Sequence, residues 1–172
     1  MYVDTISWDA NSLKDALGLT FDEVYEFFTD GRKVAFLLEK RLFKRFGEKE
    51  AKSGSPFDFI TPDDAKVEVR VVTRHGVFFC PCSMKGSGRH FDAEKFKEKL
   101  LQVDFYLLAD LTTFPDTQFI AVPSSCIYDA WINGKLGPTT SISYIKCRKL
   151  FFKDHIDEEI MEQIEEISGN QI

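Results

Sequence analysis

Two acidic residues and one arginine stand on neighbouring stretches of strand-like sequence. Asp58 lies between two phenylalanines, and Glu68 and Arg70 alternate with valines over 66–73, so both would point to one face of a strand. If the two strands pair, the three charged side chains converge at one edge or fork of a sheet. Two carboxylates and the carbonyl of Val69 would suit a hard cation with oxygen ligands, such as Mg²⁺.

The chemistry that this set of groups would support is phosphodiester hydrolysis. A bound Mg²⁺ can activate water and stabilise a pentacovalent phosphate, and Arg70 could hold the scissile phosphate or stabilise its developing charge. The alternative is that Glu68 and Arg70 form the solvated face of a half-exposed strand, where V-E-V-R-V alternation is common. The spacing alone leaves both interpretations open.

The elements that would position these groups follow from capping residues and hydrophobic spacing. Helices are predicted over 9–17, 21–28 and 31–46, the last ended by Gly47. Apolar residues recur every four positions on one side of the longest helix, and Glu39 falls at the edge of that stripe. The stripe is therefore expected to face the core.

Segments with strand-like patterns follow, separated by turn residues. Strands are predicted at 57–60, 66–73, 77–82, 104–110, 119–122 and 141–145. Helices are predicted at 93–101 and 126–132, and an acidic C-terminal helix at 154–168. This order predicts a single α/β (α+β) domain over 1–172, with a mixed central β-sheet flanked by helices and an N-terminal helical segment at 1–30.

Composition favours one intracellular domain with a Phe-rich core. The chain has 172 residues, of which 44% are hydrophobic and 17 are Phe. No apolar run approaches the roughly 18 residues of a membrane-spanning helix, and the segment 1–11 lacks the basic start of a secretory signal. Four cysteines are too few for a disulfide framework, which favours a reducing, cytoplasmic compartment.

The acidic charge is concentrated in the tail. The net charge is −6, and seven acidic residues fall within 154–166, so the chain without those seven is near +1. A protein that coats nucleic acid by bulk electrostatics is therefore not expected. A local basic face remains compatible with this composition.

Two further motifs have competing interpretations. Cys80 and Cys82 offer two thiolates, but structural zinc takes four ligands, so buried strand cysteines are the favoured interpretation. The segment 85–90 is basic and contains two glycines. It could bind phosphate through backbone N–H groups or be a plain surface loop, and it lacks the spacing of a Walker motif.

The segment 31–122 resembles the core of the PD-(D/E)XK nucleases, the restriction-endonuclease-like superfamily. Residues 56–59 (PFDF) resemble the PD element with one inserted residue, and residues 67–70 (VEVR) resemble the (D/E)XK element. Glu39 matches the additional acid that many members carry on the preceding helix. The helix and strand predicted over 93–107 match those that complete this core.

The resemblance implies a Mg²⁺-dependent DNA endonuclease, most like a small type II restriction enzyme, with Mn²⁺ as a substitute metal. Asp58 and Glu68 would bind the metal, Glu39 would support it, and Arg70 would contact the scissile phosphate. Arginine stands where the family has lysine, and it cannot release its proton near neutral pH. Lys85 could instead reach the site. A homodimer would be needed to cut both strands of double-stranded DNA.

Two alternatives of other classes remain. The arginine and the acidic balance would also fit a catalytically inactive module of the same fold that binds DNA or a protein. A weaker third possibility is an acidic protein whose tail occupies the nucleic-acid-binding surface of a partner. Within the nuclease hypothesis, Ser83-Met84-Lys85 resembles a variant in which the motif lysine follows a serine on the third strand.

Overall fold

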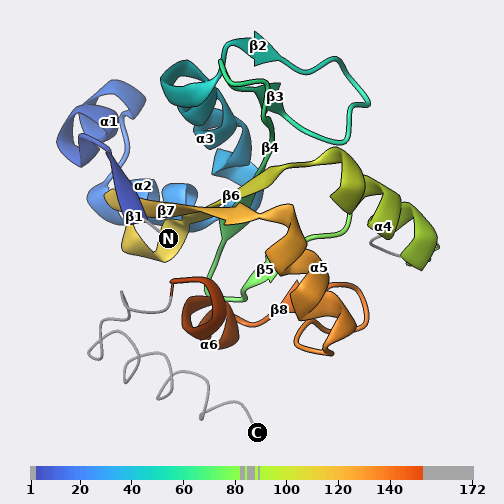
Figure 1. The fold of residues 1–172 in the computed structure, drawn as a ribbon. Coiled ribbons are helices and arrows are strands. Elements are labelled where there is room, and N and C mark those ends of the chain that lie inside the picture. Colours follow the sequence, from blue (N-terminus) through green and yellow to red (C-terminus); the bar gives the residue numbers. More distant parts are fainter. Residues whose placement is uncertain (1–2, 82–83, 85–87, 89, 153–172) are drawn as a thin grey trace, which may run out of the picture.

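A mixed six-stranded sheet runs through the molecule, with helices on both of its faces (Figure 1). In spatial order its strands are β1 (Val3–Ser7), β7 (Asp116–Pro123), β6 (Phe105–Asp110), β4 (Lys66–Val72), β3 (Phe59–Ile60) and β2 (Lys49–Glu50). The computed structural model describes residues 3–81, 84, 88 and 90–152. Only β4 and β6 are parallel neighbours in this sheet. The predicted α/β (α+β) class with a mixed central sheet is confirmed.

Three helices at the start of the chain end and begin where capping residues predict. They are α1 (Ala10–Leu17), α2 (Phe21–Thr29) and α3 (Gly31–Phe46). Thr20 and Glu23 form a reciprocal capping box at the start of α2. Gly18 ends α1 with a φ of 65°, a left-handed conformation that glycine adopts at little cost. The segment 1–30 also contains β1, a strand that hydrophobic alternation did not reveal.

The β3–β4 hairpin leads into the crossover that builds the parallel pair. From β4 the chain passes through β5 (Val77–Phe78) and α4 (Ala93–Gln102) before it returns in β6. The register pairs Glu68 with Tyr106 and Arg70 with Leu108. Strand β3 is shorter than the predicted strand at 57–60, because only its last two residues pair with β4.

The predicted third strand at 77–82 does not join the central sheet. Strand β5 is two residues long and pairs with β8 (Ser141–Ile142) in a separate sheet. After β5 the backbone N–H groups of Phe79 and Cys80 donate to the carbonyl and side-chain oxygens of Thr140, which ends regular pairing. The strand predicted at 141–145 is shorter in the structure, because β8 ends at Ile142 and a helix starts at Tyr144.

Short helical elements complete the described chain. They are η2 (Leu111–Thr113), α5 (Ser124–Ile132), α6 (Tyr144–Cys147) and a π-helical turn, η3 (Arg148–Phe152). The acidic helix predicted at 154–168 lies outside the described residues. In the described ranges no helix has the length and apolar character needed to cross a membrane.

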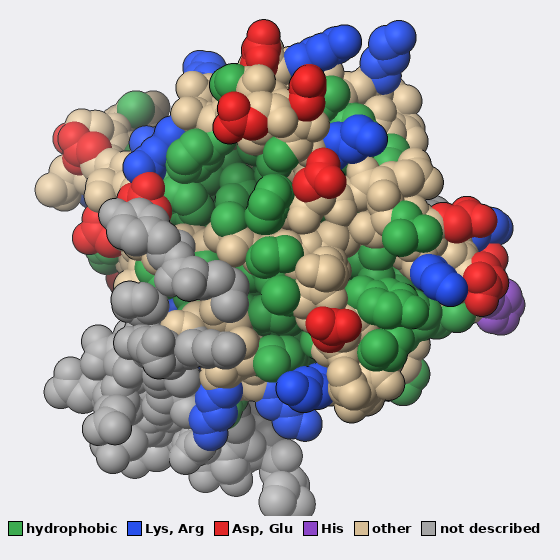
Figure 2. Space-filling model, in the orientation of Figure 1, with side chains coloured by type: hydrophobic (Ala, Val, Ile, Leu, Met, Phe, Trp, Pro, Cys, Tyr) green, Lys and Arg blue, Asp and Glu red, His purple; other side chains and the backbone are tan. Residues whose placement is uncertain are grey.

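The two faces of the sheet carry two hydrophobic clusters. Val67 and Val69 face α2 and α3, whose buried residues include Val24, Leu38 and Leu42. Alternate residues of a strand point to opposite faces of the sheet. Tyr106 and Leu108 of β6 therefore point to the other face, where they pack with α4 and α5. Figure 2 shows hydrophobic side chains gathered over the middle of one view of the molecule, with most charged side chains toward its margins.

Both edges of the central sheet are short or covered. At the β1 edge, the backbone carbonyl of Thr5 accepts a hydrogen bond from Arg45 Nη1 at 3.1 Å, and that of Ser7 accepts one from Arg41 Nη1 at 3.2 Å. Both arginines project from α3. At the opposite edge, β2 is only two residues long.

Candidate functional site

Glu68 is buried on β4 and pairs with two cations. Its Oε1 lies 2.5 Å from Arg70 Nη2 and 2.6 Å from Lys99 Nζ, and the residue is 4% exposed. The solvated-face interpretation is therefore wrong for Glu68, because α4 covers this part of the sheet. Burial raises the pKa of the Glu68 carboxyl, Arg70 and Lys99 oppose that rise, and the charge of Asp58 adds to it.

Lys99 reaches this carboxylate from α4, across 31 residues of chain. It is 8% exposed and lies on the buried side of the helix with Phe96 and Leu100. Burial lowers the pKa of the Lys99 ammonium and the charge of Arg70 lowers it further, while Glu68 opposes both effects. The (D/E)XK pattern does not point to Lys99. The sequence feature that could have identified it is a lysine within the apolar stripe of an amphipathic helix, which predicts a buried ammonium.

Asp58 marks the point at which β3 and β4 separate. Its backbone N–H still donates to the carbonyl of Val67 at 2.8 Å, as in a ladder. Its side-chain Oδ2 accepts a hydrogen bond from the backbone N–H of Val69 at 2.7 Å. A side-chain contact thus replaces the strand pairing that ends here, and it fixes the carboxylate beside the segment of β4 that carries Glu68.

Glu39 approaches the same place from α3, whose core side packs on the opposite face of the sheet. Its side chain is half-buried. Burial raises the pKa of the Glu39 carboxyl, and the negative charges of Asp58 and Glu68 raise it further, while Lys40 opposes them. Three carboxylates from three separate elements therefore act on one another electrostatically.

Arg70 is held at one end of its guanidinium. Its Nη1 donates to the carbonyl of Val69 at 3.2 Å, and Nη2 pairs with Glu68. Its Nε is buried without a hydrogen-bond partner, and in the described part of the chain the hydroxyl of Tyr106 is the other side-chain atom in this condition. Burial raises the pKa of that hydroxyl, and the charge of Glu68 adds to the rise.

Asp58 and Glu68 each keep one carboxylate oxygen that could bind a metal ion. Within the described ranges, no group of three or more His, Cys, Asp or Glu side chains has the arrangement that holds a metal ion. The hydrogen bonds and ion pairs of Asp58 and Glu68 use one oxygen of each carboxylate, and the Val69 carbonyl accepts a hydrogen bond from Arg70. Mg²⁺ is often bound by one or two carboxylates, with water and substrate phosphate completing its shell. Two carboxylates with one oxygen each outside these contacts would suit a partly hydrated ion better than a metal enclosed by protein ligands.

The remaining sequence-based candidates are the basic segment 85–90 and the two cysteines of the 80–82 motif. Lys85 and Cys82 lie outside the described residues, as does most of the segment 85–90. Cys80 is a buried free thiol, as predicted, but it lies just after β5 and not on a strand.

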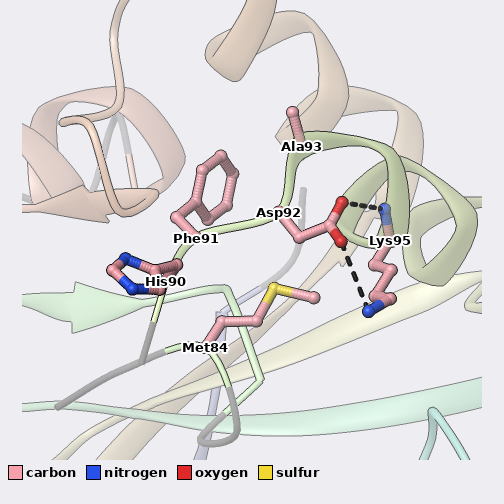
Figure 3. Close-up of a pocket in the computed structure, with 6 residues that line it drawn as sticks. All are labelled: Met84, His90, Phe91, Asp92, Ala93 and Lys95. Carbon is pink, nitrogen blue, oxygen red and sulfur yellow. Dashed lines mark hydrogen bonds and ion pairs between the residues drawn. The ribbon is translucent and has the colours of Figure 1, made fainter. Parts of the chain in front are cut away.

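A hollow of about 620 Å³ at the start of α4 is a second place to look for a site (Figure 3). Asp92, which lines it, caps α4 by accepting a hydrogen bond from the backbone N–H of Lys95 at 3.1 Å. The same carboxylate pairs with the Lys95 ammonium at 3.3 Å. Figure 3 shows both contacts closing on one turn of the helix. The charged groups of the hollow are thus directed at each other, and the Glu68 cluster is the stronger candidate.

Comparison of the chain with protein-family models, with curated proteins and with solved structures finds no match. The functional argument therefore rests on the geometry of the cluster.

Proposed function

We propose that the protein is a metal-dependent DNA endonuclease that hydrolyses phosphodiester bonds at the Glu68 cluster. The observation that carries the proposal is the convergence of Asp58 and Glu68 with two cations, Arg70 and Lys99, where the β3–β4 hairpin opens. The charges of both carboxylates also raise the pKa of Glu39 on α3. Adjacent carboxylates and cations suit a reaction in which a metal ion and a phosphate must be bound together.

The order of elements supports the resemblance to PD-(D/E)XK nucleases. Helix α3 with Glu39 precedes a hairpin that carries Asp58 and Glu68, and α4 then leads to β6, which lies parallel to β4. This is the sequence of helix, hairpin, helix and strand that the resemblance implies. The separate position of β5 is a departure from it.

Mg²⁺, or Mn²⁺ in its place, would be held by Asp58 and Glu68, with Glu39 acting directly or through water. When bound, such an ion activates water and neutralises charge on the phosphate. The chain's own contribution is electrostatic positioning. The guanidinium of Arg70 can hold a phosphate oxygen.

Lys99 supplies the amine that the sequence motif lacks. Arg70 occupies the motif position of lysine, yet Lys99 places an ammonium 2.6 Å from the motif acid Glu68. Because burial lowers the pKa of Lys99, its ammonium releases a proton more readily than that of an exposed lysine. We therefore assign the proton-transfer role to Lys99 and not to Arg70.

A second candidate function has an observation of its own. Arg70 and Lys99 both pair with the same Glu68 oxygen, so the cluster neutralises much of its charge without a metal. This favours an inactive module of the same fold that binds DNA or a protein and keeps the ion pairs for structure.

A cleavage assay separates the two functions. Supercoiled plasmid and linear phage DNA are incubated with the protein in Mg²⁺, Mn²⁺ or EDTA, alongside Glu68→Gln, Lys99→Met and the exposed control Glu98→Gln. The nuclease proposal expects metal-dependent cleavage that both cluster variants abolish and the control retains. Intact DNA with every metal, or full activity in Glu68→Gln, would overturn it in favour of the binding module.

The substrate and assembly follow from the same proposal. Double-stranded DNA, a homodimer that cuts both strands and a cytoplasmic location would fit a sequence-specific restriction enzyme. Discrete bands in the cleavage assay would support sequence specificity, whereas a metal-dependent smear would indicate a degradative nuclease.

A further inference from the structure

Two buried polar atoms without hydrogen-bond partners belong to residues on β4 and β6 that flank Glu68 in the sheet. They are Arg70 Nε and the hydroxyl oxygen of Tyr106, and within the described residues they are the complete set of such side-chain atoms. Tyr106 is 0% exposed. Native proteins pair almost all buried donors and acceptors, so each exception calls for a bound partner.

Strand geometry brings both atoms to the same side of the sheet. Tyr106 on β6 stands in register with Glu68 on β4, and Arg70 follows two residues later on the same strand. Side chains two residues apart in a strand share a face. The influence of Glu68 and Arg70 on the pKa of the Tyr106 hydroxyl is consistent with this placement.

We propose that Tyr106 and Arg70 bind one internal water molecule beside Glu68, and that Tyr106 thereby acts as a positioning residue for the guanidinium of Arg70. The hydrogen-bonding chemistry of the two atoms fits a small neutral ligand. The Nε–H of Arg70 can only donate, whereas the Tyr106 hydroxyl can donate or accept. A water can accept from Arg70 Nε, exchange a hydrogen bond with the Tyr106 hydroxyl and donate to a carboxylate. Three such bonds are typical of a buried water.

The water would complete the hold on Arg70. Its Nη1 and Nη2 are already fixed by the Val69 carbonyl and by Glu68. A third contact at Nε leaves the guanidinium one orientation. If the cluster is a nuclease site, as proposed above, this is the orientation in which Arg70 meets a phosphate, and the inference rests on the proposed function only for that last step.

Tyr106→Phe removes the hydroxyl and keeps the ring, and Tyr128→Phe, at a half-buried tyrosine on α5, is the matched control. NMR on protein labelled with ¹⁵N-arginine measures hydrogen exchange at each Nε–H.

We expect Tyr106→Phe to accelerate exchange at Arg70 Nε by about tenfold or more, with Arg41 Nε unchanged. We also expect Tm to fall by about 2–4 °C, the shift expected when a domain of this size loses one satisfied hydrogen bond. The control should change neither quantity.

A crystal structure of the unsubstituted chain gives the direct test. Electron density for a water within hydrogen-bond distance of both atoms supports the inference. A Tm that is unchanged or raised in Tyr106→Phe, together with no density, overturns it. These measurements need no activity, so they remain decisive if the cleavage assay fails. If DNA is cut, Tyr106→Phe should lower kcat with little change in KM, because the residue does not touch substrate.

Discussion

At the residue scale, Glu68 is the group on which the site depends. It is almost fully buried, and its ion pairs join two elements that are far apart in the chain. Removing one partner of a buried ion pair leaves the other charged and without compensation, which is why such substitutions are costly. The two cations around Glu68 make that cost unequal for the three residues.

Glu68→Gln should therefore destabilise the protein more than Lys99→Met. The first removes the ion-pair partner that Arg70 and Lys99 share, a loss of about 3–5 kcal/mol in the free energy of unfolding. The second leaves Glu68 still paired with Arg70. Urea unfolding of both variants and of the double variant measures the coupling. Additive losses would show that Glu68 and Lys99 are not coupled, and equal losses in the two single variants would contradict the predicted order.

Glu39 predicts a pH dependence of stability. Its carboxyl has a pKa raised above 4.5 by burial and by Asp58 and Glu68. The folded protein therefore binds this proton more tightly than the unfolded chain, so Glu39's contribution to stability decreases as pH rises from 4.5 through the raised pKa. Glu39→Gln should remove that part of the slope and increase Tm at pH 7. Thermal unfolding from pH 4 to 8 checks this, with Glu98→Gln as control. A parallel pH profile in both variants would contradict the shift.

The sequence shows part of this cluster. Asp58, Glu68 and Arg70 follow from period-two alternation on strands that pair with each other. Lys99 does not, because its partner is on β4 and the contact depends on how α4 crosses the sheet. Tyr106 is likewise indistinguishable from an ordinary core aromatic until the register with Glu68 is known.

At the scale of elements, the start of α3 is packed against the strand that carries the site. A Cβ on Gly31 would lie 2.9 Å from Val71 Cγ2 and 3.0 Å from Thr73 Cγ2. Those distances are shorter than van der Waals contact. Glycine here permits α3, and with it Glu39, to approach β4 closely.

Gly31→Ala should consequently destabilise the fold although alanine favours helices. Overpacking of this kind costs about 1–3 kcal/mol. Val71→Ala removes the nearer methyl group, so the double variant should be more stable than the sum of the single effects predicts. Urea unfolding of the four proteins provides the measurement. Strict additivity would mean that the two side chains do not meet.

Elements with local signals are the ones that the sequence predicts well. The bounds of α3 and the capping box of α2 depend on residues within one turn of each helix end. Strands β1, β2 and β5 are defined by partners elsewhere, and β2 and β5 have only two residues each. Alternation alone therefore could not predict that β1 and β2 exist, or that β5 belongs to a separate sheet.

At the scale of the whole molecule, the sheet divides the core into two clusters that share its strands. Leu42 represents the α3 side and Ile127 the α5 side, and both are 0% exposed. Because β4, β6 and β7 each contribute buried residues to both clusters, loss of packing on one face weakens the support of the other.

Leu42→Ala and Ile127→Ala should each lower stability by about 2–5 kcal/mol. Each should shift a single transition, with calorimetric and van't Hoff enthalpies equal. Differential scanning calorimetry tests this. A second transition in either variant would show that the two faces unfold independently.

The arginines on α3 that bond to β1 have a consequence for how copies of this protein could associate. An exposed edge strand is a template onto which another chain can add a strand. The Thr5 and Ser7 carbonyls of that edge are already occupied, and the far edge offers only a two-residue strand. A continuous intermolecular sheet is thereby disfavoured, both as a route to aggregation and as the seam of a homodimer. A stable pair of subunits is therefore expected to meet through surfaces other than the edges of the central sheet.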